Sequence, residues 1–386
     1  MLKNSVNILG FAKRLKYTPN NIFPSIGYYS TVSKKKIYNH HDMKFLPQKD
    51  MDAFMAYMPK FVEDVTSSEV MLYHPPCNQR MKRFLEYMLP AGKRLRQHVM
   101  IFTYKAIEEH HGTFSPEKMQ EMYKLCWCLE LYNQGNTIMD DIIDDHENRR
   151  GKPTWYHMEG TKAAVGDMIV VYTLVKRIMK KYFQHHPKYP QLLETIFPLE
   201  IPLSLVLELE TKNFDDFTLE RCDEISEMKC GYYISVQPLL LTTLLANKEF
   251  ELNEQAKKIF FYLGYLYHTQ NDLLDIYGED LAGKSGKDIG DNRITYLIAM
   301  AQRKASDSQM KRLRNNYGKR DPECIAAVKE IYDELDILGE YYKQEEEYLE
   351  KVSEEIQKIP HGFSRTLIEK IAYVQSFGLI GVPPFK

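Results

Sequence analysis

The sequence predicts an all-α protein, a single large bundle of about ten long helices around a central cavity. From residue 50 onward, apolar residues recur at steps of three and four, as in Met51, Phe54, Met55 and Met58. Segments that alternate apolar and polar residues between hairpin turns, as strands do, are missing. The protein has 386 residues, 44% of them hydrophobic, which is enough to build one large core.

Long apolar segments with helical spacing follow one another along the sequence. They cover residues 51–65, 125–145, 163–183, 225–246 and 254–278. Clusters of proline and glycine separate the segments, at residues 74–76, 89–93, 149–153, 185–190 and 278–290. Several segments are apolar on nearly every side, which is typical of helices at the centre of a large bundle.

The first 41 residues differ from the rest of the sequence. They contain Lys3, Lys13, Arg14 and Lys34, several serines and asparagines, and no acidic residue before Asp42. Such a basic leader without acids is typical of a mitochondrial transit peptide, so we expect residues 1–41 to be disordered and to direct mitochondrial import. The alternative is a disordered basic tail on a cytoplasmic protein. In either case we expect the folded part to begin near residue 45.

Composition excludes several classes of protein. A net charge of −2 gives no general attraction to nucleic acid. The six cysteines form no CxxC pair and have no zinc-site spacing, so we expect free thiols. No apolar segment reaches the ~18 residues typical of a transmembrane helix.

The segment MDDIIDDHENRRG, residues 139–151, places Asp140, Asp141, Asp144 and Asp145 close together at the end of a long apolar helix. Because a helix turns once per ~3.6 residues, Asp140 and Asp144 lie one above the other, with Asp141 alongside. Clustered carboxylates suit Mg²⁺, which takes oxygen ligands and often shares them with substrate phosphates. A solvated acidic patch is the alternative for this motif taken alone.

A second acidic motif, QNDLLDIYGED, ends the helix predicted over residues 254–278. Asn271, Asp275 and Glu279 have the spacing i, i+4, i+8, which aligns three oxygen-bearing side chains over two turns. Two such motifs can hold several Mg²⁺ ions and a diphosphate. The sequence therefore predicts that both acidic motifs bind metal.

Basic residues that could bind a diphosphate accompany both motifs. They are Lys93, Arg96, Arg149, Arg150, Lys229, Lys284 and Arg293. For any one of them a solvated surface charge is the alternative. Lys229 differs from the others because its neighbours in EMKCGYYISV are mostly apolar.

The two motifs resemble those of the farnesyl/geranyl diphosphate synthase family, the short-chain trans-isoprenyl diphosphate synthases. The segments DDIIDDHENRRGKPTWYH and QNDLLDIYGEDLAGKSGKDIGDN carry the resemblance, which extends from residue 50 to the C terminus. It implies the isoprenoid synthase fold for residues 45–386, a homodimer and a prenyl diphosphate substrate. It also implies three Mg²⁺ ions per active site, with which family members ionise an allylic diphosphate and join the carbocation to isopentenyl diphosphate.

The resemblance also implies a role for each matching residue. Catalysis would depend on Asp140, Asp144, Lys229 and Asn271. The metal ligands would be Asp140, Asp141, Asp144, Asn271, Asp275 and Glu279. The allylic diphosphate would be held by Arg149, Lys229 and Lys284, with His268 and Arg293 as further substrate-binding residues. The isopentenyl diphosphate pocket would be formed by Lys93, Arg96, Asn133 and Arg150.

Several positions depart from the family pattern. Asn133 stands where the family has Gln or His, Asn271 where it has Asp, His268 where it has Gln and Cys230 where it has Thr. The sequence ends in FGLIGVPPFK, whereas many family members end in a basic tail. Most of these changes fall on the residues expected to bind isopentenyl diphosphate or the allylic diphosphate, and the frame of metal-binding residues survives, with an amide at Asn271.

From these departures the sequence favours a class I terpene synthase, similar to insect terpene synthases that derive from this family. Such an enzyme would ionise one allylic diphosphate with Mg²⁺, farnesyl diphosphate being favoured, and release a terpene and diphosphate after cyclisation or elimination. The alternative is a short-chain prenyl diphosphate synthase, because Lys93 and Arg96 are kept. A non-catalytic partner subunit is a third possibility, against which the intact Asp140, Asp144 and Asp275 argue.

The preference for a C15 over a C10 substrate depends on two small residues. Gly135 and Asn136 precede the first aspartate by five and four positions, where the family often has large aromatic residues. We expect small residues there to deepen the pocket for the prenyl group. The product skeleton stays open.

Overall fold

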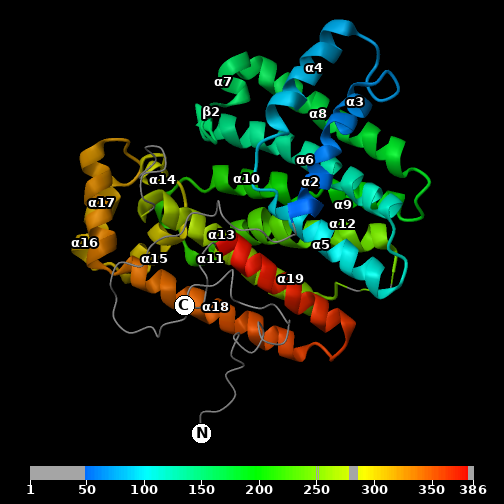
Figure 1. Ribbon diagram of the computed structural model, residues 1–386. Coiled ribbons are helices and arrows are strands. Elements are labelled where there is room, and N and C mark those ends of the chain that lie inside the picture. The colour runs from blue at the N-terminus through cyan, green and yellow to red at the C-terminus, as the bar shows by residue number, and fades with distance from the viewer. Residues whose placement is uncertain (1–47, 249, 251, 278–285, 381–386) are drawn as a thin grey trace. The chain divides into compact units, whose positions relative to one another are not determined.

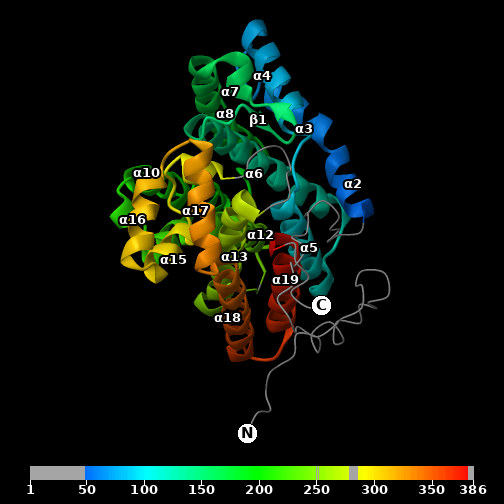
Figure 2. The same cartoon turned by 90° about the vertical axis from the view of Figure 1, so that its left-hand side faces the viewer.

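The prediction of an all-α fold is confirmed by the computed structural model, which describes residues 48–248, 250, 252–277 and 286–380 (Figures 1 and 2). The leader over residues 1–41, Glu279, Lys284 and the last six residues lie outside the described residues. Among those that are described, no helix is both long and apolar enough to cross a membrane. None of the six cysteines, all of which are among the described residues, forms a disulfide bond, as expected.

The described helices and strands divide between two units. The N-terminal unit contains α2 (Gln48–Ala56), α3 (Met58–Thr66), α4 (Pro75–Met88), α5 (Leu95–His110), α6 (Pro116–Ile143), β1 (Asn148–Arg149), β2 (Lys152–Pro153), α7 (Trp155–Glu159), α8 (Thr161–Phe183), α9 (Tyr189–Ile196) and α12 (Gln237–Ala246). The C-terminal unit contains α10 (Glu200–Glu210), η3 (Phe214–Asp216), α11 (Leu219–Ser226), η4 (Glu227–Val236), α13 (Glu254–Tyr277), α14 (Lys287–Gly290), α15 (Tyr296–Lys304), α16 (Asp307–Asn316), α17 (Pro322–Glu334), α18 (Ile337–Lys358) and α19 (Phe363–Ile380).

In the N-terminal unit, α6 is the central helix. It begins at Pro116, earlier than the apolar pattern indicates, because the Ser115 hydroxyl accepts the Lys118 N–H and proline suits the first helical position. Helix α8 packs along α6, and α5 packs against both α6 and α12 (Figure 1). Helix α6 is therefore covered by more than one helix of this unit.

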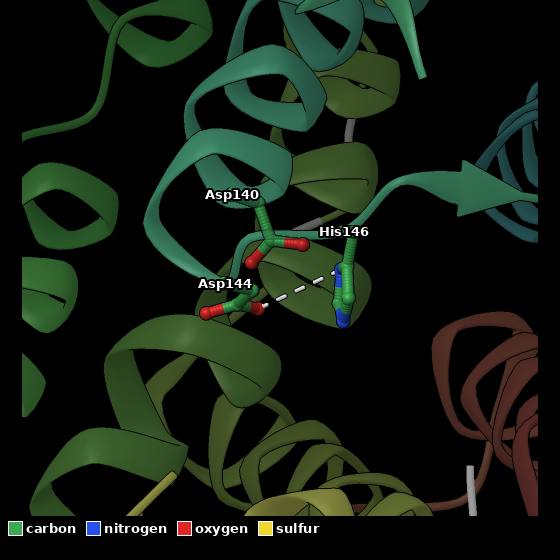
Figure 3. A group of neighbouring side chains, drawn as sticks. All are labelled: Asp140, Asp144 and His146. Atoms are coloured by element: carbon green, nitrogen blue, oxygen red, sulfur yellow. Dashed lines mark ion pairs between the residues drawn. The ribbon is translucent and has the colours of Figure 1, made fainter. Parts of the chain in front are cut away.

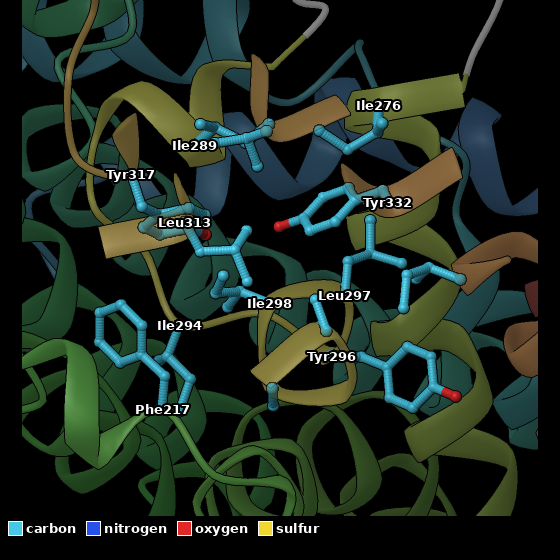
Figure 4. Packing of buried hydrophobic residues seen from close by; sticks show 14 of the residues in the cluster. Phe217, Ile276, Ile289, Ile294, Tyr296, Leu297, Ile298, Leu313, Tyr317 and Tyr332 are labelled. Carbon is cyan, nitrogen blue, oxygen red and sulfur yellow. The ribbon is translucent and has the colours of Figure 1, made fainter. Parts of the chain in front are cut away.

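In the C-terminal unit, α13 packs against η4, α18 and α19 (Figure 2). A further core lies beyond α13, where α15, α16 and α17 enclose buried side chains such as Tyr296, Leu313 and Tyr332 (Figure 4). The second acidic motif thus belongs to a helix that is held on several sides.

The helix predicted over residues 225–246 is not uniform. It consists of the end of α11, the π-helix η4 and then α12. Pro238, near the start of α12, has no N–H, and its ring would clash with the Ile234 carbonyl in a regular α-helix. The wider π-helical turns just before Pro238 relieve this clash, and π-helical segments often occur at functional sites. Lys229 lies in this segment.

One small hairpin departs from the expectation that strands are missing. β1 and β2 pair antiparallel, with Arg149 opposite Lys152. Arg150 and Gly151 form the turn with φ values of 55° and 75°, as a type I′ turn requires. Strands of two residues are too short to show an alternating pattern, so no sequence signal indicated them.

Candidate active site

The first acidic motif lies at the carboxyl end of α6. Asp144 ends this helix and donates its backbone N–H to the Asp140 carbonyl at 2.9 Å. The backbone then turns at Asp145, whose φ is 50°, and His146 donates its backbone N–H to the Asp141 carbonyl at 2.9 Å. This turn brings the His146 side chain back beside the aspartates.

Asp140, Asp144 and His146 form a candidate metal site (Figure 3). One ligand atom from each residue lies within 4.8 Å of the others, and His146 Nδ1 lies 4.0 Å from Asp144 Oδ2. In the part of the protein that the structure describes, no other group of three acidic, histidine or cysteine side chains meets this condition. Two of the three side chains are carboxylates, whose oxygen atoms are the ligands that Mg²⁺ prefers.

Asp141 makes a contact that the sequence did not predict. Its carboxylate is almost completely buried and accepts a hydrogen bond from Arg149 Nε at 2.6 Å. Arg149 Nη2 also donates to Asp140 Oδ2 at 2.7 Å. Burial alone would lower the pKa of Arg149, but the two carboxylates raise it above its ordinary value. Asp141 therefore anchors Arg149, which neutralises part of the acidic cluster, and metal binding by Asp141 stays a prediction.

The predicted isopentenyl diphosphate residues lie close together in the N-terminal unit. Arg150 packs against Gly92, where a Cβ would lie 2.9 Å from Arg150 Nη1. The Arg150 side chain is exposed, but partial desolvation and then the charges of Arg149, Arg94 and Arg96 lower its pKa against the opposing influence of Glu130. Partial desolvation and the charge of Arg150 likewise lower the pKa of Lys93. A group of cations that repel one another in this way is suited to bind an anion.

A buried ion pair supports the loop that carries Lys93. Arg94 Nη1 lies 2.6 Å from Glu130 Oε1, and both side chains are buried. The Glu130 carboxylate also accepts hydrogen bonds from Gln97 Nε2 at 2.9 Å and from Gln134 Nε2. Asn133 Nδ2 lies 3.5 Å from the same carboxylate. The Asn133 amide, predicted to contact isopentenyl diphosphate, is thus directed at Glu130.

The second acidic motif lies at the end of α13. Asn271 is exposed, and its side-chain amide donates to the Tyr267 carbonyl at 2.9 Å. Asp272 is buried, and its carboxylate accepts the Tyr296 N–H at 2.8 Å, which fixes the start of α15. Asp275 Oδ2 accepts the Asp288 N–H at 3.1 Å. The helical spacing of Asn271 and Asp275 is confirmed, while Glu279 lies outside the described residues.

Lys229 and Arg293, both predicted to bind diphosphate, are joined by a carboxylate. Glu208 of α10 accepts a hydrogen bond from Lys229 Nζ at 2.7 Å, and Arg293 Nη2 lies 3.4 Å from its other oxygen. Burial would raise the pKa of Glu208, but the charges of Lys229 and Arg293 lower it below its ordinary value. Arg293 Nη1 also lies 3.7 Å from Asp288. The two cations are therefore held by acidic side chains.

His268 lies next to this group on α13 and is half-buried. Its pKa falls from 6.5 to about 4, mainly because of burial and then because of the positive charge of Lys229. The imidazole is therefore neutral at pH 7. In that state it can donate or accept a hydrogen bond, as the amide of a glutamine can.

Several residues of these groups were not predicted from the sequence. His146 follows Asp144 too closely to share a helix face with it, and only the turn at Asp145 brings it back. Glu208 lies far from either motif in sequence, and Glu130 lies in the apolar segment that ends in the first motif, ten residues before Asp140. A charged residue within such a segment is the one signal that could have indicated them, because an acid is seldom buried without a partner.

The fold and the acidic site together define a helical enzyme of diphosphate chemistry. The protein belongs to the polyprenyl synthetase family, whose family model matches residues 78–335. The farnesyl pyrophosphate synthase of Gallus gallus is 29% identical over 324 residues, 81% of this chain and 88% of that protein. The geranyl diphosphate synthase of Ips pini is 29% identical over 357 residues, 88% of this chain and 85% of that protein.

A solved structure shows the same fold. The crystal structure of T. brucei farnesyl diphosphate synthase matches this protein with a TM-score of 0.77 and 20% identity, covering 85% of this chain and 99% of that chain. Family membership makes this protein an enzyme of isoprenoid biosynthesis. The relatives named here are diphosphate synthases, so they support the alternative function more directly than the terpene synthase that the sequence favoured.

Proposed function

We propose that this protein is a Mg²⁺-dependent short-chain prenyl diphosphate synthase, which joins isopentenyl diphosphate to an allylic diphosphate. The observation that carries the proposal is the group of Lys93, Arg96 and Arg150, in the same unit as Asp140 and Asp144. A prenyl transfer needs sites for two diphosphates, whereas a terpene synthase needs one. A second group of cations, beyond those at the acidic motifs, would hold the second diphosphate, which only the transfer requires.

Asp140 and Asp144, with His146 beside them, are the residues that would hold Mg²⁺ in the N-terminal unit. Bound Mg²⁺ would supply positive charge to the diphosphate as its bond to the allylic carbon breaks. Asn271 and Asp275 of the C-terminal unit, with Glu279, are the second set of proposed metal ligands, and the family resemblance implies three ions per active site. Arg149 keeps the Asp140 carboxylate oriented through its hydrogen bond of 2.7 Å.

The basic residues hold the two diphosphates in this proposal. Lys93, Arg96 and Arg150 bind isopentenyl diphosphate through charge-assisted hydrogen bonds, which are stronger than neutral ones. Lys229, Lys284 and Arg293 bind the allylic diphosphate. Glu208 holds Lys229 and Arg293 in position until the anion arrives.

A class I terpene synthase is the second candidate, and two observations favour it. The Asn133 amide lies 3.5 Å from Glu130, and it is one methylene shorter than the Gln that family members have at this position. Asn271 gives the second motif an amide where the family has a carboxylate. Under this candidate the allylic cation reacts with its own double bonds, with farnesyl diphosphate as the favoured substrate.

One experiment separates the two candidates. Purified protein without residues 1–41 is incubated with Mg²⁺ and dimethylallyl, geranyl or farnesyl diphosphate, with and without isopentenyl diphosphate. We expect a longer prenyl diphosphate that forms only when isopentenyl diphosphate is present. Terpene hydrocarbon from a single allylic diphosphate, with no longer diphosphate in any mixture, would establish the terpene synthase instead.

We also propose that the protein is a homodimer. Helix α10 and the residue before it expose Leu199, Leu203, Val206 and Leu209, which follow the helical period along one side. Glu208, bonded to Lys229, lies away from this side. An exposed apolar stripe of this kind usually marks a protein interface, because water contact with it is unfavourable.

For residues 1–41 the proposal is mitochondrial import, with a cytoplasmic location as the alternative. It rests on their basic, acid-free composition. Fused to a fluorescent reporter, these residues should direct it to mitochondria, and a reporter that stays in the cytoplasm would contradict the proposal.

A further inference from the structure

A buried carboxylate of α8 binds residues of two neighbouring helices. Asp167 has 4% of its surface exposed. Arg80 of α4 donates to both of its oxygens, from Nε to Oδ1 at 2.7 Å and from Nη2 to Oδ2 at 2.6 Å. Trp155 of α7 donates from Nε1 to Asp167 Oδ2 at 2.7 Å. Two parallel bonds between a guanidinium and a carboxylate fix the orientation of both groups, so Asp167 holds α4 and α7 against α8 (Figure 1).

Other contacts between α4 and α7 add to this arrangement. Arg80 Nη1 donates to Glu159 at 2.8 Å, and the Trp155 ring meets the Phe84 ring edge to face at a centroid distance of 5.1 Å. The Glu159 side chain is 20% exposed, whereas Asp167 is almost completely buried. Because water and salt screen a buried charge much less than an exposed one, we expect the Asp167 carboxylate to contribute most to holding the two helices together.

The elements that Asp167 connects lead to residues predicted to bind isopentenyl diphosphate. Lys93 lies in the loop that follows α4, and Arg150 lies in the turn of the β1–β2 hairpin, just before α7. Near the end of α4, the Tyr87 hydroxyl donates to the Pro153 carbonyl at 2.6 Å. Trp155 begins α7 shortly after this hairpin. A movement of α4 relative to α7 would therefore change the distance between Lys93 and Arg150.

Lys93 and Arg150 repel each other, because both carry a positive charge. Arg150 packs beside Gly92, and its charge lowers the pKa of Lys93. Like charges stay close together only where other interactions offset their repulsion. The bonds of Asp167 to α4 and α7 are such interactions, since they oppose the separation of the two elements that carry the cations.

We propose that Asp167 is a positioning residue for isopentenyl diphosphate. It touches no substrate, but it keeps α4 and the β1–β2 hairpin at the spacing at which Lys93 and Arg150 bind the same diphosphate. The inference rests on the proposed function, because only the prenyl transfer requires this second diphosphate.

The allylic diphosphate should depend less on Asp167. Arg149, on the same hairpin, has hydrogen bonds of its own, at 2.6 Å to Asp141 and at 2.7 Å to Asp140. Lys229 belongs to the C-terminal unit. A positioning role therefore predicts a change in the KM for isopentenyl diphosphate alone, whereas a general loss of structure would affect both substrates.

Variants of the carboxylate and of its indole partner test the inference. Asp167→Asn keeps the shape of the side chain and removes its charge. It should raise the KM for isopentenyl diphosphate by roughly tenfold or more, because a misplacement of about 1 Å can cost about 100-fold, and it should change the KM for the allylic diphosphate little. Trp155→Phe removes the indole N–H and keeps an aromatic ring. It should cause a smaller increase, and it serves as the second variant if Asp167→Asn does not fold.

Asp64→Asn is the matched control within the same unit. Asp64 of α3 is also buried, and its carboxylate accepts hydrogen bonds from α8, at 2.8 Å from the Tyr182 hydroxyl and at 3.2 Å from Lys181 Nζ. Its replacement should lower stability but leave the KM for isopentenyl diphosphate unchanged. A folded Asp167→Asn variant whose KM for isopentenyl diphosphate rises no more than that of Asp64→Asn would overturn the inference.

Amide hydrogen exchange separates this inference from the proposed function. The Thr154 N–H donates to the Glu147 carbonyl at 2.8 Å and closes the base of the hairpin. Mass spectrometry should show faster exchange over residues 147–155 in Asp167→Asn than in Asp64→Asn, because the hairpin opens more often once α7 is released. This readout needs no substrate. An unaltered protein that never forms a longer diphosphate contradicts the prenyl transfer, whereas unchanged exchange in Asp167→Asn contradicts the positioning role.

Discussion

At the scale of single residues, Asp140 and Asp144 differ in what their removal would disturb. Asp140 belongs to the candidate metal group and also binds Arg149 Nη2 at 2.7 Å. Removing its charge would therefore leave Arg149 with one carboxylate partner fewer. Asp144 belongs to the same group and lies beside His146, so its replacement keeps both hydrogen bonds of Arg149 and is the cleaner test of metal binding.

We predict that Asp144→Asn lowers Mg²⁺-dependent diphosphate release by roughly 100-fold or more, because even outer partners of a metal contribute about 10- to 100-fold. The helical circular dichroism should not change. Glu109→Gln, at an exposed position on α5, is the matched control and should keep full activity. Near-normal release by a folded Asp144→Asn variant at limiting Mg²⁺ would contradict the metal site.

His268 gives a prediction for pH. Its pKa in the folded protein, about 4, lies below the ordinary 6.5, so folding favours the neutral ring. The stability that this ring contributes is complete above pH 6.5 and is lost as the pH falls toward 4. Between pH 7 and pH 5, the free energy of unfolding should therefore decrease by roughly 1–2 kcal/mol less in His268→Gln than in the unaltered protein.

The measurement is the free energy of unfolding by denaturant at both pH values. His98, whose pKa burial also lowers to about 4, remains in the variant, so part of the pH dependence should persist. Gln184→Ala, at an exposed position, is the control, because it changes no titratable group and should leave the pH dependence as it is. If the free energy of unfolding decreases as much in His268→Gln as in the unaltered protein, the pKa of His268 is not lowered by folding.

At the scale of elements, the contact between η4 and α13 determines where Lys229 lies. Gly231 on η4 and Gly264 on α13 approach so closely that a Cβ on Gly264 would overlap the Gly231 backbone. The same approach brings Lys229 near His268, whose pKa it lowers. Backbone atoms cannot move aside as a flexible side chain can, so this contact requires glycine.

Gly264→Ala should therefore lower the free energy of unfolding by about 1–3 kcal/mol, as overpacking usually does. It should also raise KM for the allylic diphosphate, because η4 and Lys229 must shift. Gly166→Ala on α8 is the matched control, since a Cβ there meets nothing within 4 Å. That variant should gain about 0.5–1 kcal/mol from helix propensity. Equal stability of the two variants would contradict the close packing.

At the scale of the whole molecule, the exposed apolar side of α10 gives a prediction about assembly. Val206, with 54% of its surface exposed, lies in the middle of this side. Val206→Asp places a charge in the proposed interface, where an unpaired charge is costly. Analytical ultracentrifugation should show a homodimer for the unaltered protein and a shift toward monomer for the variant.

Leu72→Asp is the control for this prediction, because Leu72 is 64% exposed outside α10. Leu72→Asp should leave the mass measured by analytical ultracentrifugation at that of the dimer. A monomer in the unaltered protein would contradict the homodimer, and a dimer kept by Val206→Asp would place the interface elsewhere.

The helical fold and the two acidic motifs could be predicted without coordinates. Both are local properties: apolar spacing depends on the helical period, and Asp140 with Asp144, or Asn271 with Asp275, come together through one helical turn. The grouping of Lys93 with Arg150 was predicted through the family resemblance, and the lowering of the Lys93 pKa by the charge of Arg150 is consistent with it.

The side chains that meet across elements could not be predicted in this way. Asp141 binds Arg149 because a hairpin folds back on α6, and Glu208 joins Lys229 and Arg293 from three separate parts of the C-terminal unit. Gly135 was expected to open a pocket, but Tyr172 fills the space from α8. The sequence around Gly135 holds no information on this ring, because close packing depends on which residue of a neighbouring helix occupies the space that glycine leaves.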